Sequence, residues 1–294
     1  MSTAPASRSV TEFESWRARL IGLGYRMLGS RAAAEDLAQE TWLRWHGTPR
    51  GTIRDPGAWL RATMTRLCID ELRARRARRE QYVGPWLPEP WVGEATDSVD
   101  AIELAGDLSN AFMLLLERLA PEERAAFLLH EVFDADHAEI AGLLGKSQAA
   151  VRQIVSRARA RVASDRPRFQ PTRQEQAALA RRFVEAVASR DHATLVALFA
   201  ADATLVSDGG GKAAAARRPI VGAERIARFF LGVVARHASA GTALDPCRIN
   251  ASPGFIVRAR DGSTIATLCF EVGDGRIRSA WMVRNPDKLV RLAP

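Results

Sequence analysis

The sequence predicts a multidomain protein in which two all-α units precede a C-terminal α+β unit. Three observations predict this order. Residues 9–163 place apolar side chains at helical spacing, interrupted by a proline-rich segment, and they end in a helix-turn-helix pattern. After residue 173 the pattern changes to helices followed by strand-like runs. The length of 294 residues also exceeds what one typical domain needs.

Composition and charge limit the classes of function. The chain is 47% hydrophobic and 26% charged, as globular proteins are, and its net charge of +8 favours polyanionic partners. No apolar run approaches the roughly 18 residues of a membrane span, and the first residues lack the apolar core of a signal peptide. We therefore expect a cytoplasmic protein that does not contact a membrane.

The cysteines indicate neither disulfides nor metal. Cys68, Cys247 and Cys269 are odd in number and far apart, and no pair has the spacing of metal ligands. Buried reduced thiols are the expectation. The sequence predicts no metal site, and no cofactor is expected.

A first helix is expected from Ser30, which can cap it, to about Trp45. Its inner stripe consists of Ala34, Leu37, Ala38, Thr41 and Trp45. Its outer side carries Glu35, Asp36, Gln39 and Glu40. Because this acidic side would repel phosphate, it favours contact with a basic protein surface. The alternative is that the acids only complement the helix dipole.

A second helix is expected to start near Pro56, with an apolar stripe of Leu60, Met64 and Leu67. Trp59, Thr63, Arg66, Asp70 and Arg73 fall on another face, within a stretch where seven arginines stand against three acids. An aromatic ring beside a row of arginines suits stacking on unpaired bases and neutralisation of phosphates. Alternatively, Trp59 is a core anchor and the arginines solvate the helix.

The helix-turn-helix pattern runs from Leu119 to Val162. Gly145 permits a left-handed helix end, and Ser147 can cap the next helix. An inward stripe is formed by Val151, Val155, Ala158 and Val162. The opposite side carries Gln148, Arg152, Ser156 and Arg159, with Gln153, Arg157 and Arg161 beside it. A solvated basic surface is the simple alternative, but the short preceding helix and the glycine turn favour entry into a DNA major groove.

The segment Tyr82–Asp100 contains three prolines and no sustained periodicity, which predicts an extended linker. In the C-terminal unit, helices are expected at 174–190, 191–199 and 222–236. Strands are expected at 203–207, 247–252, 255–260, 263–272 and 276–283. Asp261-Gly262 and Asp274-Gly275 stand where hairpin turns require them. The sequence therefore predicts an α+β unit that ends in an antiparallel meander.

Three segments resemble a known family. YRMLGSRAAAEDLAQETWLRW (25–45), DPGAWLRATMTRLCIDELRARRARRE (55–80) and the helix-turn-helix resemble the second and fourth regions of bacterial sigma factors, in particular the extracytoplasmic-function (ECF) group. The segments GPWLPEP (84–90), DGGGK (208–212) and RNPDKL (284–289) resemble the subgroup with a C-terminal SnoaL-like domain, a cone-shaped curved sheet around an apolar pocket. The resemblance implies a region-2 domain at 9–80, a linker at 81–105, a region-4 domain at 106–164, a connector at 165–173 and a SnoaL-like domain at 174–294.

The resemblance also implies partners and residue roles. The partners would be core RNA polymerase, through the clamp helices of its largest subunit, and promoter DNA. The polymerase contact would use Asp36, Gln39 and Glu40. The −10 element would be held by Trp59, Thr63, Arg66, Arg73, Arg75 and Arg76, and the −35 element by Gln148, Arg152, Gln153, Ser156, Arg157 and Arg159. Trp86 and Trp91 would pack on the region-2 domain, in the polymerase or on the third domain.

The C-terminal domain is expected to regulate the sigma domains by intramolecular contact. The expected contact residues are Asp208, Gly209, Gly210, Gly211, Lys212, Asn285, Pro286 and Asp287. The DGGGK loop could instead be a flexible surface loop or an anion site. Asp208, His192, His237 and Asp202 form no convincing acid–base pair, so an enzyme is not expected. A small-molecule ligand, a sensor or enzyme role for this domain, and a DNA-binding regulator independent of polymerase remain open alternatives.

Overall fold

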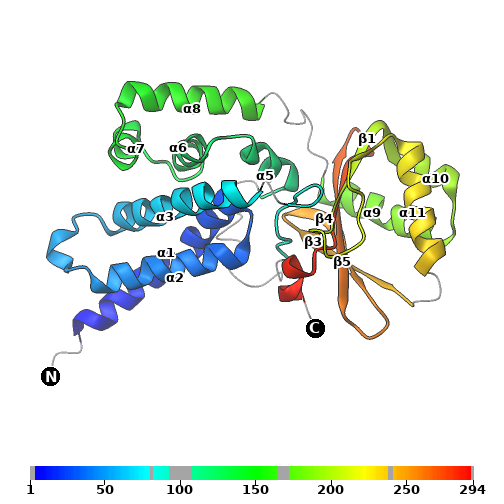
Figure 1. Ribbon diagram of the computed structural model, residues 1–294, viewed down its shortest axis with the longest axis horizontal. Helices are drawn as coiled ribbons and strands as arrows, with labels where there is room; N and C mark the ends of the chain where they lie inside the picture. Colours follow the sequence, from blue (N-terminus) through cyan, green and yellow to red (C-terminus); the bar gives the residue numbers. More distant parts are fainter. Residues whose placement is uncertain (1–3, 80–81, 93–107, 164–171, 238–240, 293–294) are drawn as a thin grey trace. The chain divides into compact units, whose positions relative to one another are not determined.

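The computed structural model describes residues 4–79, 82–92, 108–163, 172–237 and 241–292, and these form two compact units (Figure 1). Unit 1 holds residues 1–80, 94–108 and 112–166. Unit 2 holds residues 81–93, 109–111 and 167–294, so the start of the expected linker belongs to the C-terminal unit. The expected linker at 93–105 and most of the expected connector, up to residue 171, lie outside the described residues.

Unit 1 begins with three helices, α1 (Ala4–Leu28), α2 (Arg31–Gly47) and α3 (Pro56–Arg79), with a 3₁₀ turn, η1 (Arg50–Thr52), before α3. Ser30 caps α2 as predicted, since its side chain accepts from the Ala33 N–H. The three helices approach closely at Gly24. A Cβ atom there would lie 2.4 Å from Met64 Cε and 2.9 Å from Ala34 Cβ, so glycine is required for this packing.

The second part of unit 1 contains α5 (Asn110–Glu117), α6 (Pro121–Glu131), α7 (His137–Leu144) and α8 (Gln148–Ala163). The predicted helix-turn-helix is confirmed. Gly145 ends α7 with φ of 65°, and Ser147 Oγ accepts from the Ala150 N–H at the start of α8. The four predicted inward residues of α8 are all buried.

Unit 2 is an α+β domain in which α9 (Arg173–Ala188), α10 (His192–Leu198) and α11 (Ala223–His237) cover one face of a sheet (Figure 1). Its strands are β1 (Phe199–Asp208), β2 (Ile220–Val221), β3 (Ala243–Ile249), β4 (Ser252–Arg258), β5 (Thr264–Gly273) and β6 (Arg276–Val283), in the order β2-β1-β6-β5-β4-β3. Two 3₁₀ turns, η3 (Pro286–Lys288) and η4 (Val290–Leu292), follow β6.

The strands differ from the expectation in two ways. The run at 247–252, expected as one strand, crosses a hairpin turn at Asn250 and Ala251, whose φ angles are 50° and 60°. The antiparallel meander β3–β6 is confirmed, but β1 pairs with β6 in parallel, which makes the sheet mixed. Periodicity cannot reveal such a pairing, because the two strands lie far apart in the sequence.

The core of unit 2 lies between the sheet and its helices, and aromatic rings dominate it. The Phe183 ring lies 4.9 Å from the rings of both Phe230 and Phe270, in edge-to-face arrangements. Such pairs add to the free energy gained by burial of the rings. The core therefore fixes α9 and α11 against one face of the sheet and leaves the other face for other contacts.

Candidate functional site

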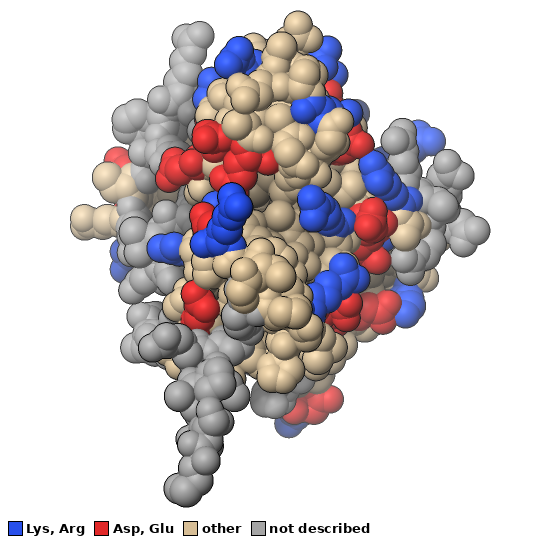
Figure 2. Space-filling model, turned by 90° about the vertical axis from the view of Figure 1, so that its left-hand side faces the viewer, with Lys and Arg blue, Asp and Glu red and all other residues tan. Residues whose placement is uncertain are grey.

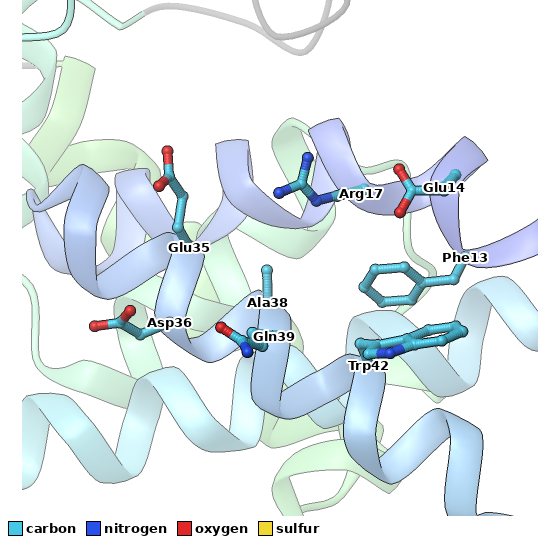
Figure 3. Close-up of a pocket in the computed structure, with 8 residues that line it drawn as sticks. All are labelled: Phe13, Glu14, Arg17, Glu35, Asp36, Ala38, Gln39 and Trp42. Carbon is cyan, nitrogen blue, oxygen red and sulfur yellow. The ribbon is translucent and has the colours of Figure 1, made fainter. Parts of the chain in front are cut away.

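The first candidate surface is a groove between α1 and α2 with a volume of about 260 Å³ (Figure 3). Its lining residues are Phe13, Glu14, Arg17, Glu35, Asp36, Ala38, Gln39 and Trp42. The Phe13 and Trp42 rings, 5.0 Å apart, lie at one end, and the carboxylates of Glu35 and Asp36 lie at the other. The groove therefore combines acidic groups with an aromatic wall.

The polar side chains on the outer side of α2 differ in their ion pairs and in their exposure. Glu35 pairs with Arg31 at 2.9 Å and Glu40 pairs with Arg44 at 2.8 Å, whereas Asp36 and Gln39 are exposed at the groove. Leu43, which is 58% exposed, lies one turn further along α2. The aromatic and aliphatic parts of this surface were not among the residues predicted from the sequence. An apolar residue at an outward position of α2 was the signal that could have revealed Leu43.

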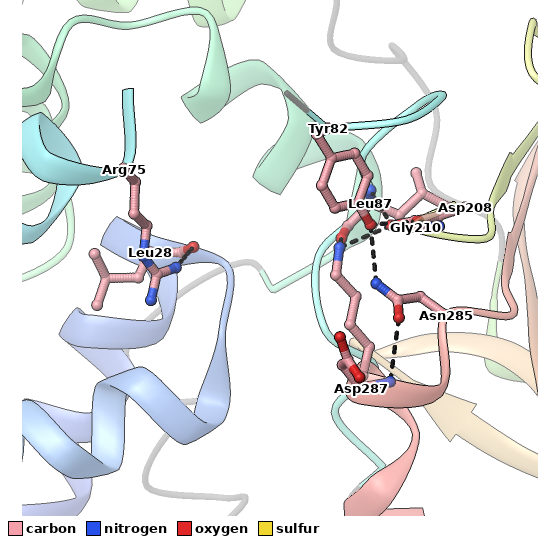
Figure 4. A network of polar contacts seen from close by, with 9 residues as sticks. Leu28, Arg75, Tyr82, Leu87, Asp208, Gly210, Asn285 and Asp287 are labelled. Carbon is pink, nitrogen blue, oxygen red and sulfur yellow. Dashed lines mark hydrogen bonds and ion pairs between the residues drawn. The ribbon is translucent and has the colours of Figure 1, made fainter. Parts of the chain in front are cut away.

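The second candidate surface lies on α3, and the structure divides its predicted residues. Thr63 is buried, and Trp59 is half-buried with its ring 5.6 Å from that of Trp45, which matches the core-anchor alternative. Arg66 and Arg73 are exposed. Arg75 pairs with Glu71 at 2.6 Å and donates to the Leu28 carbonyl at 3.4 Å (Figure 4), while Arg76 lies on α3 with its side chain outside the described part.

The third candidate surface is the outer side of α8. All six residues predicted to meet duplex DNA are exposed: Gln148, Arg152, Gln153, Ser156, Arg157 and Arg159. Arg159 pairs with Glu131 of α6 at 2.6 Å. Polar amide, hydroxyl and guanidinium groups on one exposed helix are the groups that contact base edges and phosphates.

Ion pairs join α3 to α6 and α7 within unit 1. Arg61 meets Glu139 at 2.8 Å, and Arg73 meets Glu122 at 2.8 Å. A hydrogen bond from Lys146, and next the neighbouring Arg73, lower the pKa of Glu122 below its usual value. On the face shown in Figure 2, basic and acidic side chains accordingly lie interspersed and no large patch of one sign forms.

One buried arginine accompanies these ion pairs. Arg124 of α6 is 2% exposed and donates to the Met27 carbonyl of α1 at 2.6 Å and to Glu117 at 2.7 Å. A buried guanidinium needs such partners because it has lost its water. The contact between the two helical parts of unit 1 therefore combines a largely exposed ion pair, a partly buried ion pair and one buried arginine.

An enclosed polar cluster lies in unit 2, around the Asp208 carboxylate (Figure 4). This side chain is 0% exposed and accepts hydrogen bonds from the Tyr82 hydroxyl at 2.6 Å and the Leu87 N–H at 2.9 Å. It also accepts from the Gly210 N–H at 3.0 Å and from Lys288 Nζ at 2.7 Å. Four donors, two of them from the segment 82–92, therefore compensate one buried charge.

Neighbouring groups extend this cluster. Asn285 Nδ2 donates to the Tyr82 hydroxyl at 3.1 Å, and Lys288 Nζ donates to the Leu87 carbonyl at 2.5 Å. Burial, followed by the hydrogen bond to Asp208, raises the pKa of Tyr82 and keeps its hydroxyl a donor. Lys288 Nζ also lies 4.4 Å from the centre of the Trp86 ring, a cation–π distance.

The glycine loop after Asp208 is packed against its neighbours. Gly210 has φ of 58°, and a Cβ atom there would lie 2.3 Å from Asn285 Nδ2. Gly211 has φ of 74°, and a Cβ atom there would lie 3.1 Å from Val83 Cβ. These glycines permit a close approach of the segment 82–92, which favours a packed loop over the alternative of a flexible surface loop.

The far end of the segment 82–92 is held at Asn250. Its side-chain Oδ1 accepts from the Trp91 N–H at 2.8 Å, and its own N–H donates to the Trp91 carbonyl at 2.9 Å. Asn250 Nδ2 donates to Asn110 Oδ1 at 2.5 Å, and Asn110 Nδ2 lies 2.9 Å from Cys269 Sγ. Burial raises the pKa of Cys269 to about 12, so it is a protonated thiol. Trp86 and Trp91 thus pack on the third domain.

The side chains considered for acid–base chemistry do not form one site. Asp208 is enclosed in its own cluster, His192 Nε2 lies 3.3 Å from Glu224, and Asp202 is exposed, while the side chain of His237 lies outside the described part. In the described part of the chain, no three His, Cys, Asp or Glu side chains are grouped to hold a metal ion. The helices within that part include none long and apolar enough to cross a membrane.

Comparisons with known proteins identify the two helical parts. Residues 13–78 match the model of Sigma-70 region 2, and residues 109–162 match that of Sigma-70 region 4. The chain is 38% identical to the ECF RNA polymerase sigma factor SigJ of Mycobacterium tuberculosis, over 95% of this chain and 92% of that protein. This chain belongs to the ECF sigma factors.

Other relatives of this ECF sigma factor span the same length. The probable ECF RNA polymerase sigma factor SigI of M. tuberculosis is 29% identical over 94% of this chain and 93% of its own. The crystal structure of M. tuberculosis SigJ superposes with a TM-score of 0.78 at 36% identity, over 96% of this chain and 98% of that one. The fold is thus two helical sigma domains followed by an α+β domain with a mixed sheet, which is the arrangement that the resemblance to SnoaL-like domains implies and which is called the SnoaL-like domain below.

Proposed function

We propose that this sigma factor binds core RNA polymerase, directs it to promoters, and is regulated by its SnoaL-like domain through the segment 82–92. The Asp208 cluster carries the regulatory part of the proposal. The segment leaves the region-2 helices and precedes the region-4 helices, so its path determines how far the two sigma domains separate. A domain that holds this segment therefore acts on both.

The covalent connection strengthens such a contact. A tethered domain has an effective concentration of the order of ~1 mM, so a weak intramolecular contact competes with a separate macromolecule. Two of the four hydrogen bonds to the buried carboxylate come from the segment. They make this contact specific, because any alternative path of the segment leaves the charge with only the Gly210 N–H and Lys288 as partners.

The polymerase contact is assigned to the groove of α1 and α2. Asp36 and Gln39 line it, and Glu40 lies beside it. Acidic groups next to aromatic rings suit a basic, amphipathic helical surface, which supports the clamp helices of the largest subunit as the partner. The partner polymerase also implies a cytoplasmic location.

Promoter recognition is divided between α3 and α8. The six exposed residues of α8 have the chemistry for reading the −35 element as duplex DNA. On α3, Arg66, Arg73 and Arg75 are assigned to phosphates near the melted −10 element. Trp59 packs against Trp45, so base capture by its ring requires a change in α3.

Runoff transcription with core polymerase tests the regulatory part. The full chain is compared with a chain ending after Asp165 and with the Asp208→Asn variant. We expect both changes to alter the amount of promoter-directed transcript, whereas Asp202→Asn, an exposed acid of the same strand β1, leaves it unchanged. If truncation alters neither polymerase binding nor transcription, the regulatory proposal fails.

The polymerase contact has its own test, which also separates a sigma factor from a DNA-binding regulator. Asp36→Lys combined with Glu40→Lys should abolish retention on immobilised core polymerase, with circular dichroism unchanged. Asp202→Lys, an exposed acid of β1, is the matched control and should be retained. A regulator that does not engage polymerase would be indifferent to both changes.

A further inference from the structure

Unit 2 contains a cavity of about 530 Å³ between the helix-covered face of the sheet and the helices α9 and α11. This volume is within the range of small-molecule sites, roughly 300–1,000 Å³. Most of its lining is apolar, with Phe183, Val187, Phe230, Val234, Leu268 and Met282 among the residues that face it. The wall therefore suits a hydrocarbon or ring system.

A buried hydroxyl group points to a polar group on the ligand. Side chains alternate along β1, so Ser207 shares the inner side with the core residues Ala203 and Leu205, and it lines the cavity. Its side chain is 0% exposed, and its Oγ has no hydrogen-bond partner among the described residues. Such a hydroxyl costs free energy unless a bound molecule supplies the partner.

The charge of the lining determines the sign of that group. Arg236 and Arg284 are the charged residues that line the cavity within the described part of the chain, and no carboxylate lines it there. Arg284 Nη1 donates to the Ala214 carbonyl at 2.5 Å, which leaves further guanidinium donors for a ligand. Ser207 pairs in register with Met282 of β6, two residues before Arg284, so the hydroxyl and the guanidinium belong to one end of the cavity.

We propose that this cavity binds an apolar organic acid. The carboxylate is held by the Arg284 guanidinium and the Ser207 hydroxyl, and the apolar body lies among the phenylalanine and valine side chains of α9 and α11. Arg236 adds to the positive potential. A guanidinium recognises a carboxylate through paired donors in a fixed geometry, which distinguishes acids from amines and amides.

The position of the acid group connects the cavity to the Asp208 cluster. Ser207 and Asp208 are neighbours on opposite faces of β1, and the backbone N–H groups of Arg284 and Asn285 both donate to the Asp208 carbonyl, at 2.7 and 3.0 Å. A carboxylate between Ser207 and Arg284 therefore acts on the strand ends that hold Tyr82 and Leu87. This last step rests on the proposed regulatory function, whereas binding of the acid does not.

Equilibrium dialysis of the full-length chain with radiolabelled decanoate tests binding. We expect one decanoate per chain, and at least tenfold weaker binding of decanamide and of decylamine. Arg284→Met should weaken decanoate binding at least tenfold with little effect on decanamide. The matched control is Arg278→Met, an exposed arginine of β6, the strand that precedes Arg284, and this variant should bind decanoate normally. Equal binding of the acid and the amide would overturn the proposal.

A second variant covers the case in which Arg284→Met disturbs folding. Ala266→Trp on β5 fills the cavity from its wall and should abolish decanoate binding while Arg284 stays in place. Decanoate binding that survives both variants would overturn the site.

Amide hydrogen exchange at residues 82–92, with and without decanoate, tests the connection separately. We expect decanoate to change exchange at Leu87, whose N–H is bonded to Asp208. Decanoate binding without any change there would overturn the connection and leave the binding site intact. If truncation had no effect on transcription, by contrast, the proposed regulation would fail, but the proposal that the cavity binds decanoate would stand.

Discussion

The SnoaL-like domain and the sigma domains hold their neighbouring segments by different chemistry. In unit 2, one fully buried carboxylate accepts four hydrogen bonds and fixes the segment 82–92. In unit 1, α3 meets α6 and α7 through ion pairs that keep contact with solvent, such as Arg73 with Glu122, whose side chains are 57% and 34% exposed. The strength of the buried contact depends on a complete set of hydrogen-bond partners, whereas the strength of the ion pairs in unit 1 depends on the salt concentration.

In the proposed regulation, the difference determines which contacts are released. Exposed ion pairs exchange for pairs with DNA phosphates or polymerase at little cost, so the α3 contacts are suited to release. A buried carboxylate cannot lose one partner without a large penalty, so the segment 82–92 is suited to be held or released as a whole. The following predictions test this contrast.

The largest effect is expected for Asp208→Ala. Removal of the carboxylate leaves Lys288, Tyr82 and two backbone N–H groups without their acceptor, and such buried changes cost about 3–5 kcal/mol. Urea unfolding followed by circular dichroism measures the loss. Asp287→Ala is the control, since its pair with Lys212 is 60% exposed and should be worth under ~1 kcal/mol. Equal losses in the two variants would contradict the contrast.

A smaller loss is expected for Gly210→Ala, whose Cβ atom would collide with Asn285. Crowding of this kind costs about 1–3 kcal/mol, added to the cost of a left-handed backbone. Gly275→Ala is the matched control, because φ there is 69° but nothing lies within 4 Å of its Cβ position. Thermal unfolding of both should show Gly210→Ala as the more damaging change. A larger effect at Gly275 would mean that backbone strain alone matters.

The ion pair of Arg73 and Glu122 should contribute less than either. A double-mutant cycle with Arg73→Ala and Glu122→Ala should give a coupling of about 0.2–1 kcal/mol at low salt. We expect the coupling to shrink in 0.5 M NaCl, because screening acts on exposed charges. A coupling that does not change with salt would place this pair in the same class as the Asp208 cluster.

The smallest effect is the dependence of this contact on pH. The pKa of Glu122 is lowered in the folded chain, so its stabilising contribution is fully present above the pKa of the unfolded carboxyl, about 4.3. It is lost as the pH falls through the lower folded pKa. The free energy of unfolding of the wild type and of Glu122→Gln should therefore converge as the pH is lowered below about 4. Free energies of unfolding that stay equally far apart as the pH falls would contradict the lowered pKa of Glu122.

Local signals in the sequence predict where helices begin and end, but they do not predict contacts between residues far apart in the sequence. Caps at Ser30, Asp191 and Ser147 and the glycine after α7 fix helix ends with nearby residues, so these elements could be predicted. The parallel pairing of β1 with β6 could not be predicted, because it joins residues that lie far apart in the sequence and meet only in the folded chain.

The candidate site shows the same division. The exposed residues of α8 and the acids of α2 follow from helical periodicity. The hydrogen bond between Tyr82 and Asp208 joins residues that lie 126 positions apart in the sequence, and neither residue type predicts the other as its partner. The role of the glycines after Asp208 could not be predicted either, since a flexible loop and a close approach of two backbone segments both require glycine.

Asn250 binds Trp91 through its backbone and side chain, and Asn110 through its amide nitrogen. These two partners stand on either side of the stretch 93–107, so a single hairpin residue of the SnoaL-like domain anchors the chain before and after it. Cleavage of a peptide bond within that stretch would therefore release neither anchored end. Loss of the Asn250 side chain would weaken both anchored points at once.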